Sequence, residues 1–170
     1  LPGTSLAGAL RARALRIANT LTPDRIKAGS LIDAVFGVGP EDVTAQRPDD
    51  EQKHWASRLV TDEAAVEGVQ QRVQNRIRVD RFTGGAMDNY LFNEAPVFCD
   101  GKSLVNLKLV LRGSAPDPDK PHEPRGPDEC EIGLLLLLLK DLWTGDLPLG
   151  GESSVGRGRL RGVSATLRQV

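Results

Sequence analysis

The sequence predicts an α+β fold, and three observations support that prediction. Residues 6–20 place apolar side chains at helical spacing, and the Leu-rich run 134–139 falls in a second predicted helix. Residues 105–111 alternate in the way that is typical of a strand. The chain has 170 residues, of which 39% are hydrophobic and 26% charged. These values are typical of one globular domain with its own core.

The N-terminal part is predicted to contain a helix followed by a strand. The helix covers residues 6–20 and has Thr4 as its N-cap. A short apolar segment follows at residues 31–37. Residues 55–61 have the apolar content of a strand, and 62–74 are polar and predicted to be surface-exposed. The apolar stripe of the helix consists of Leu6, Leu10, Ala14, Ile17 and Leu21.

An inserted hairpin is predicted in the middle of the chain. Residues 76–81 alternate apolar side chains with arginine, which is typical of a half-exposed strand. Gly84-Gly85 and Asp88-Asn89 are turn signals. Val97 and Phe98 close the excursion. We therefore predict an insertion over about residues 68–98.

The C-terminal part is predicted to contain a strand, a loop, a helix and a last strand. The strand covers residues 105–111. Five prolines in 113–128 predict a surface loop. The helix covers 130–143, and its segment 134–139 is apolar on all sides, which predicts deep burial. The last strand is expected at 159–167.

The resulting order is helix, strand, insertion, strand, helix, strand. One further strand before Leu1 would make it β-α-β-β-α-β, which is the ferredoxin-like order. The chain begins with Leu1-Pro2-Gly3 and without an initiator methionine. We therefore expect a single-domain fragment, residues 1–170, whose first strand is missing and is supplied by residues upstream of Leu1.

Bulk charge does not indicate a nucleic-acid partner, because the net charge is −1. The arginines nevertheless cluster within 11–27, 72–81 and 157–168, whereas acidic groups lie elsewhere. A basic face suits a polyanion, although solvated helix and strand faces are the commoner explanation for such clusters. No membrane partner is expected, because the longest apolar run, 132–139, is far shorter than the ~20 residues of a membrane span. We expect a cytoplasmic protein.

Cysteine and histidine usage predicts no metal centre and no catalytic constellation. Cys99 and Cys130 are the two cysteines, which is too few for a disulfide framework or a metal cluster. We expect them to be small buried residues in a reducing compartment. His54 and His122 are isolated in the sequence, and nothing points to a Ser-His-Asp set. No cofactor is expected for this fragment.

A Gly-rich segment follows the second predicted helix, over residues 150–159. Its four glycines let the backbone approach a ligand closely and adopt positive φ. Serine hydroxyls, arginine forks and exposed N–H groups suit a phosphate, although a flexible helix-to-strand loop explains the pattern equally well. The segment lacks the Gly-Lys-Ser/Thr of a P-loop. The candidate phosphate contacts are Gly151, Ser153, Ser154, Arg157 and Arg159.

Two further segments are candidate contacts for an anionic partner. The turn into the first helix is one, because helix N-termini attract anions; a plain helix cap is the commoner explanation. The hairpin tip is the other, because an apolar side chain there could wedge between bases; packing on the chain's own core is the alternative. The candidates are Thr4, Ser5, Gly8 and Arg11 in the first segment, and Arg81, Thr83 and Met87, the wedge, in the second.

These three segments, occurring together and in this order, resemble the RAMP superfamily of CRISPR proteins. The chain is most similar to the repeated backbone subunits of type III effector complexes. Residues 2–11 resemble the family's entry to its first helix, with Ala7 in the place of a basic residue. Residues 79–86 followed by Leu91-Phe92 resemble its thumb, and 150–158 its Gly-rich loop.

The resemblance implies a ferredoxin-like, RRM-related core with a thumb hairpin. It also implies an antiviral defence role in which subunits polymerise along a CRISPR RNA and hold its backbone. The implied partners are CRISPR RNA, complementary target RNA, copies of the chain and other effector subunits. The candidate residues above would be RNA contacts, and no catalytic residue is assigned within this chain.

Three alternatives remain open. The chain could belong to a target-RNA endoribonuclease subunit of the same complex, because family members often cleave with an aspartate upstream of the segment at Leu1, and a divalent metal would then serve the full protein. It could be a CRISPR-RNA processing endonuclease. It could also be a stand-alone phosphate- or nucleotide-binding enzyme that uses the Gly-rich loop.

Overall fold

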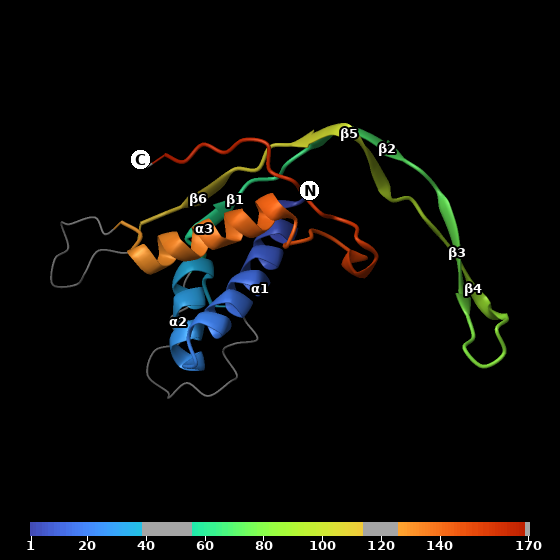
Figure 1. Ribbon diagram of the computed structural model, residues 1–170, viewed down its shortest axis with the longest axis horizontal. Helices are drawn as coiled ribbons and strands as arrows, with labels where there is room; N and C mark the ends of the chain where they lie inside the picture. The colour runs from blue at the N-terminus through green and yellow to red at the C-terminus, as the bar shows by residue number, and fades with distance from the viewer. Residues whose placement is uncertain (39–55, 114–125, 169–170) are drawn as a thin grey trace. The chain divides into compact units, whose positions relative to one another are not determined.

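The computed structural model describes residues 1–38, 56–113 and 126–168 (Figure 1). It divides the chain into two compact units. Unit 1 consists of Leu1–Glu63 and Leu107–Val170, and unit 2 of Ala64–Asn106. Three helices and small antiparallel sheets confirm the α+β class, and the arrangement is compatible with a ferredoxin-like core. The prediction of a strand before Leu1 stays a prediction.

Helix α1, Gly3–Leu21, begins earlier than predicted. Its N-cap is Pro2, which is extended and gives no side-chain cap, so the prediction of Thr4 as the N-cap is wrong. Gly3 allows this start, because a Cβ there would lie 2.6 Å from the Thr61 carbonyl oxygen. The buried side chains recur every four residues and face the core: Leu6, Leu10, Ala14 and Ala18.

Helix α2, Arg25–Phe36, was missed beyond the apolar segment 31–37. Its N-cap is Asp24, whose carboxylate accepts hydrogen bonds from the backbone N–H groups of Ile26 and Lys27. Such a cap satisfies donors that a helix start leaves free. Gly37 ends the helix with a φ of 77°. The Pro-Asp pair before the helix was therefore the sequence signal for its start.

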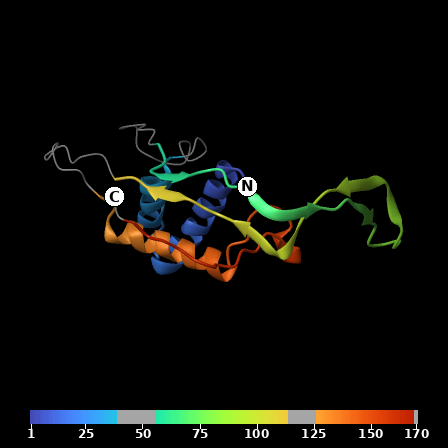
Figure 2. The same ribbon diagram turned by 90° about the horizontal axis from the view of Figure 1, so that it is seen from above.

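Strands β1, Leu59–Thr61, and β6, Leu109–Leu111, form an antiparallel pair. Leu59 pairs with Leu111; Leu59 belongs to the buried core, and the half-buried Leu109 and Leu111 pack against it. Val110, on the alternate position, is exposed. Both predicted strands are confirmed, although each is shorter than expected. Figures 1 and 2 show α1 and α3 beside this pair, and leucines of both helices share its core.

Helix α3, Glu129–Thr144, is held at its start by a capping box between Asp128 and Glu131. Its core face buries Leu134, Leu138 and Leu142. Leu136 and Leu137 are 46% and 38% exposed, so the prediction of deep burial on all sides is wrong. The helix packs against the core through one face, and the leucines outside that face are partly exposed to solvent.

The described residues after α3 contain a short 3₁₀ turn, Ser153–Val155, but no strand. The strand predicted at 159–167 is therefore wrong. The backbone there is held by the end of α3, since the Gly162 N–H donates to the Trp143 carbonyl. Gly162 also lies against the Trp143 ring, where a Cβ would clash at 1.9 Å. These contacts bring the segment to the helix and not to a described sheet edge.

Unit 2 is a ribbon made of two antiparallel ladders. Strand β2, Val66–Gln71, pairs with β5, Val97–Val105, and β3, Gln74–Val79, pairs with β4, Ala86–Glu94. The insertion predicted at about 68–98 lies within this unit. Strand β2 was missed because both faces of the ribbon are largely exposed, so its sequence shows no alternation. Polar residues therefore occur on both faces of β2.

The expectation that both cysteines are buried is wrong. Cys99 lies in β5 and Cys130 in the first turn of α3, and both thiols are free and exposed. His54 and His122, like most of the Pro-rich loop at 113–128, lie outside the described residues.

Candidate nucleic-acid interface

The first turn of α1 presents a polar face that suits an anion. Thr4, Ser5 and Gly8 are exposed on the side away from the buried leucines, and a Cβ at Gly8 would meet nothing within 4 Å. The described first turn has no acidic residue and no side-chain cap. Backbone N–H groups at a helix start lack intrahelical partners, and the helix dipole favours negative charge there. This surface can therefore accept a phosphate.

Arg11, the fourth predicted residue of this segment, is engaged within the protein. Its Nη1 donates to the Gly37 carbonyl at 2.5 Å, and its Nη2 lies 3.4 Å from Asp33 Oδ1. The guanidinium thus ties α1 to the C-terminal end of α2. Its side chain is 29% exposed, so the part of the group facing solvent is small. The sequence could not indicate this role, because α2 itself was missed.

The Gly-rich loop is closed at its base and open at its tip. The Leu149 N–H donates to the Gly158 carbonyl at 2.9 Å, and a Cβ at Gly158 would lie 1.9 Å from the Leu149 oxygen. Gly158 also has a φ of 73°, in the left-handed region that favours glycine. Ser153 and Ser154, between these ends, are exposed. The loop therefore holds two hydroxyls toward solvent on a constrained backbone.

The two arginines of this loop both have partners within the protein, one inside the loop and one at the end of α3. Arg157 Nη1 donates to the Glu152 carboxylate, and Glu152 itself sits in the left-handed region. Arg159 Nη1 donates to the Gly145 carbonyl at 2.9 Å, just after α3 ends. Both guanidinium groups therefore have protein partners in addition to their predicted role toward phosphate.

The first turn of α1 and the Gly-rich loop lie at the same end of unit 1 (Figures 1 and 2). Residues that are about 150 positions apart in the sequence are thus brought toward one another. Both segments offer donors, from N–H groups in one and hydroxyls in the other. The fold thereby places two candidate phosphate contacts at one end of the same unit.

The tip of the unit 2 hairpin is a tight turn held by its own side chains. Asp80 Oδ1 accepts from the backbone N–H groups of Phe82 and Thr83 at 2.7 and 3.3 Å. Arg81 and Thr83 are exposed, as a contact residue must be. Phe82 is 100% exposed, whereas Met87 is half-buried. The choice of Met87 as the wedge stays a prediction, and Phe82 is the more exposed apolar side chain of this tip.

Comparison with protein families finds a match over most of the chain. The model of the RAMP superfamily matches residues 1–161. The chain belongs to the RAMP superfamily. No curated protein matches it. Membership supports a CRISPR-associated, RNA-binding subunit whose partners include CRISPR RNA and an effector complex.

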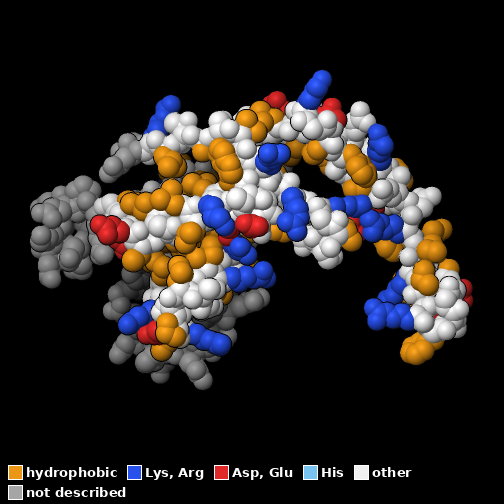
Figure 3. All heavy atoms as spheres, in the orientation of Figure 1, with side chains coloured by type: hydrophobic (Ala, Val, Ile, Leu, Met, Phe, Trp, Pro, Cys, Tyr) orange, Lys and Arg blue, Asp and Glu red, His pale blue; other side chains and the backbone are white. Residues whose placement is uncertain are grey.

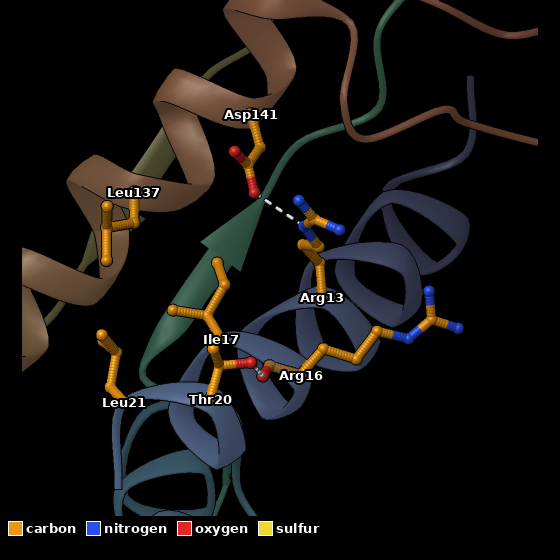
Figure 4. Close-up of a pocket in the computed structure, with 7 residues that line it drawn as sticks. All are labelled: Arg13, Arg16, Ile17, Thr20, Leu21, Leu137 and Asp141. Atoms are coloured by element: carbon orange, nitrogen blue, oxygen red, sulfur yellow. Dashed lines mark hydrogen bonds and ion pairs between the residues drawn. The ribbon is translucent and has the colours of Figure 1, made fainter.

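A second feature of this RAMP protein is a cavity of about 290 Å³ between α1 and α3 (Figure 4). Arg13 Nε lies 2.6 Å from Asp141 Oδ2 and closes one wall, while the Arg16 side chain extends away from that pair. Arg13 and Asp141 are 128 positions apart, so the sequence does not indicate this pair. The lining residues are Arg13, Arg16, Ile17, Thr20, Leu21, Leu137 and Asp141.

Asp141 is ionised in a buried position. Burial is the largest influence and opposes ionisation, but hydrogen bonds from Arg13 and Lys140, with their charges, outweigh it and lower the pKa of this carboxyl. The pKa of Lys140 is raised, first of all by its hydrogen bond to Asp141. The cluster is thus a charge-paired link between helices, and its groups are already satisfied by one another.

The parts of the chain that the structure describes contain no group of three His, Cys, Asp or Glu residues able to hold a metal ion. None of the described helices is both long enough and apolar enough to cross a lipid bilayer. The expectation of a divalent metal in a longer protein stays a prediction.

Proposed function

We propose that this chain binds the backbone of CRISPR guide RNA as a repeated scaffold subunit of a cytoplasmic type III effector complex in antiviral defence. The observation that carries the proposal is the joint presence, at one end of a RAMP-family unit, of an uncapped helix start and a constrained loop with two exposed serines. Copies of the chain, other effector subunits and a complementary target RNA would complete the assembly.

Contacts of this kind fit a carrier whose guides vary in sequence. N–H and hydroxyl donors bind phosphate oxygens and therefore read no bases. The electrostatic part of such binding is independent of sequence and weakens as salt rises. Base pairing between guide and target would supply the specificity, as in other RNA-guided systems.

The hairpin tip would act on base stacking rather than on phosphates. Apolar side chains can insert between bases and unstack them. Phe82, fully exposed, is the wedge that we favour over Met87. Arg81 and Thr83 flank it and would contact the adjacent backbone.

The test introduces negative charge at the loop. Ser153→Glu with Ser154→Glu puts two carboxylates where phosphates would lie, and Ser164→Glu with Thr166→Glu is the matched control on another exposed segment. Guide-RNA affinity is measured by gel shift on the complex assembled from the full gene product. We expect the loop variant to bind at least about tenfold more weakly, because like charges repel. Equal affinity of the two variants would contradict the proposal.

The same assembly separates the alternatives. A labelled complementary target with and without Mg²⁺ shows whether the complex also cleaves, which would favour the endoribonuclease alternative. Affinity for mononucleotides without length-dependent RNA binding would favour a stand-alone nucleotide-binding enzyme.

A further inference from the structure

The β3–β4 ladder of unit 2 has two chemically different faces. Arg76 stands opposite Phe92, and side chains two residues apart in a strand share a face. We call the side formed by Arg76, Arg78, Tyr90 and Phe92 the arginine–aromatic face. Ile77 stands opposite Leu91 on the other side, which we call the aliphatic face.

The rings of the arginine–aromatic face are held in place and remain accessible. The Arg78 guanidinium carbon lies 5.2 Å from the centroid of the Tyr90 ring, a cation–π distance. Arg76 Nε lies 3.0 Å from Glu94 Oε2. Tyr90 and Phe92 are 44% and 46% exposed. Two aromatic surfaces and a net positive charge therefore lie side by side.

The local backbone supports this orientation. Asn89 has a φ of 62°, and the pairing register shifts between Ile77 and Val79. Such a bulge bends its strand and redirects neighbouring side chains. Asn89 lies directly before Tyr90, whose ring contacts the Arg78 guanidinium. A second arginine–ring contact, Arg72 over Phe98 at 5.7 Å, lies in the other ladder.

Half-exposed rings in a hairpin are not explained by packing. Figure 3 shows hydrophobic and basic side chains side by side along unit 2, at its right. A ring with an adjacent guanidinium is the combination on which unpaired nucleotides stack while their phosphates are neutralised. Paired bases cannot use it, because their faces are covered by their neighbours in the stack.

We propose that the arginine–aromatic face is a stacking site for unpaired RNA nucleotides. This site differs from the hairpin tip. At the tip, Phe82 would insert between bases that are already stacked, whereas unpaired bases would stack on the rings of the arginine–aromatic face. The inference rests on the proposed function, since it presupposes a complex that holds RNA.

The test uses the assembled complex and a short single-stranded RNA that carries 2-aminopurine, whose fluorescence is quenched by stacking. Tyr90→Leu with Phe92→Leu removes the rings and keeps apolar strand residues. Ile77→Thr with Leu91→Thr is the matched control on the aliphatic face. We expect the ring variant to lose the quenching and to bind about tenfold more weakly, while the control and the binding of fully paired duplex RNA stay unchanged.

A milder variant, Arg78→Gln, guards against misfolding, which far-UV circular dichroism monitors in each variant. It should reduce quenching in part, because the ring loses its guanidinium partner. Normal guide binding together with full quenching in the ring variant would overturn this inference alone. Absence of guide binding in the wild-type complex would instead overturn the proposed function. Loss of a protein subunit from the ring variant, with RNA binding intact, would make the face a protein contact and also overturn the inference.

Discussion

Arg58 and Glu131 form a two-pronged ion pair beneath the surface of unit 1. Their Nη1–Oε1 and Nη2–Oε2 distances are 2.5 and 3.0 Å, and the side chains are 15% and 4% exposed. Arg58 Nε also donates to the Arg112 carbonyl. Arg58→Ala should lower the free energy of unfolding by about 3–5 kcal/mol, because it leaves a buried carboxylate without its positively charged partner. Urea denaturation measures this loss.

The control for this prediction is the exposed pair Lys108–Asp62. Lys108→Ala should cost less than about 1 kcal/mol, since solvent screens such pairs. If the two variants lost similar stability, the buried pair would not have the structural role that its geometry indicates.

Asp141 should make stability sensitive to acid. Its pKa is lower in the folded protein than the usual value of about 3.9, so the folded state binds fewer protons. Such a carboxyl contributes stability above its unfolded pKa, and that contribution is lost as pH falls through the folded pKa. Thermal melts from pH 7 to 3 should show the loss below about pH 4. In Asp141→Asn, which is less stable at pH 7, the loss should be smaller. If the stability of Asp141→Asn depended on pH in the same way as that of the wild type, this role of Asp141 would be contradicted.

Glu152 should restrain RNA binding, because its carboxylate holds Arg157. Glu152→Gln removes the competing charge and leaves the loop glycines in place. We expect tighter guide binding and a slope of log affinity against log salt that is steeper by about 0.7, the value of one additional phosphate contact on a single strand. Gel shifts at several salt concentrations measure the slope. An unchanged slope would mean that Arg157 does not reach phosphate.

At the scale of elements, what could be predicted depended on whether a segment buries one face. Periodicity found α1 and α3, since each packs an apolar stripe into the core. It missed β2, which buries no face. It misplaced a strand at 159–167, because local alternation cannot reveal that the backbone is held by Trp143.

The start of α1 is one of the two segments that we propose as phosphate contacts. Gly8→Glu is expected to leave the helix folded, because the new Cβ meets open space and the side chain suits a helix better than glycine. It should weaken guide binding at least about tenfold through repulsion. Gly29→Glu in α2, also in open space, is the control. Equal RNA affinity in both variants, measured by filter binding, would remove α1 from the interface.

At the scale of the whole molecule, the candidate site was only partly predictable. The helix start and the Gly-rich loop were recognisable as motifs, and the fold places them at one end of unit 1. The partners of Arg11, Arg157 and Arg159 were not predictable, because they depend on the ends of α2 and α3 and on a closed loop. The exposure of the aromatic rings in unit 2 was likewise not predictable, since the sequence does not show whether another element packs over these strands.

The central claim is that the chain holds guide RNA through its backbone. The most direct test measures the affinity of the assembled complex for two guides of unrelated sequence and equal length over a range of salt. We expect equal affinities for the two guides and a common decrease of both with salt, because phosphate contacts read no bases and the electrostatic part of the binding weakens as salt rises. A strong preference for one guide, or binding that does not weaken with salt, would contradict it.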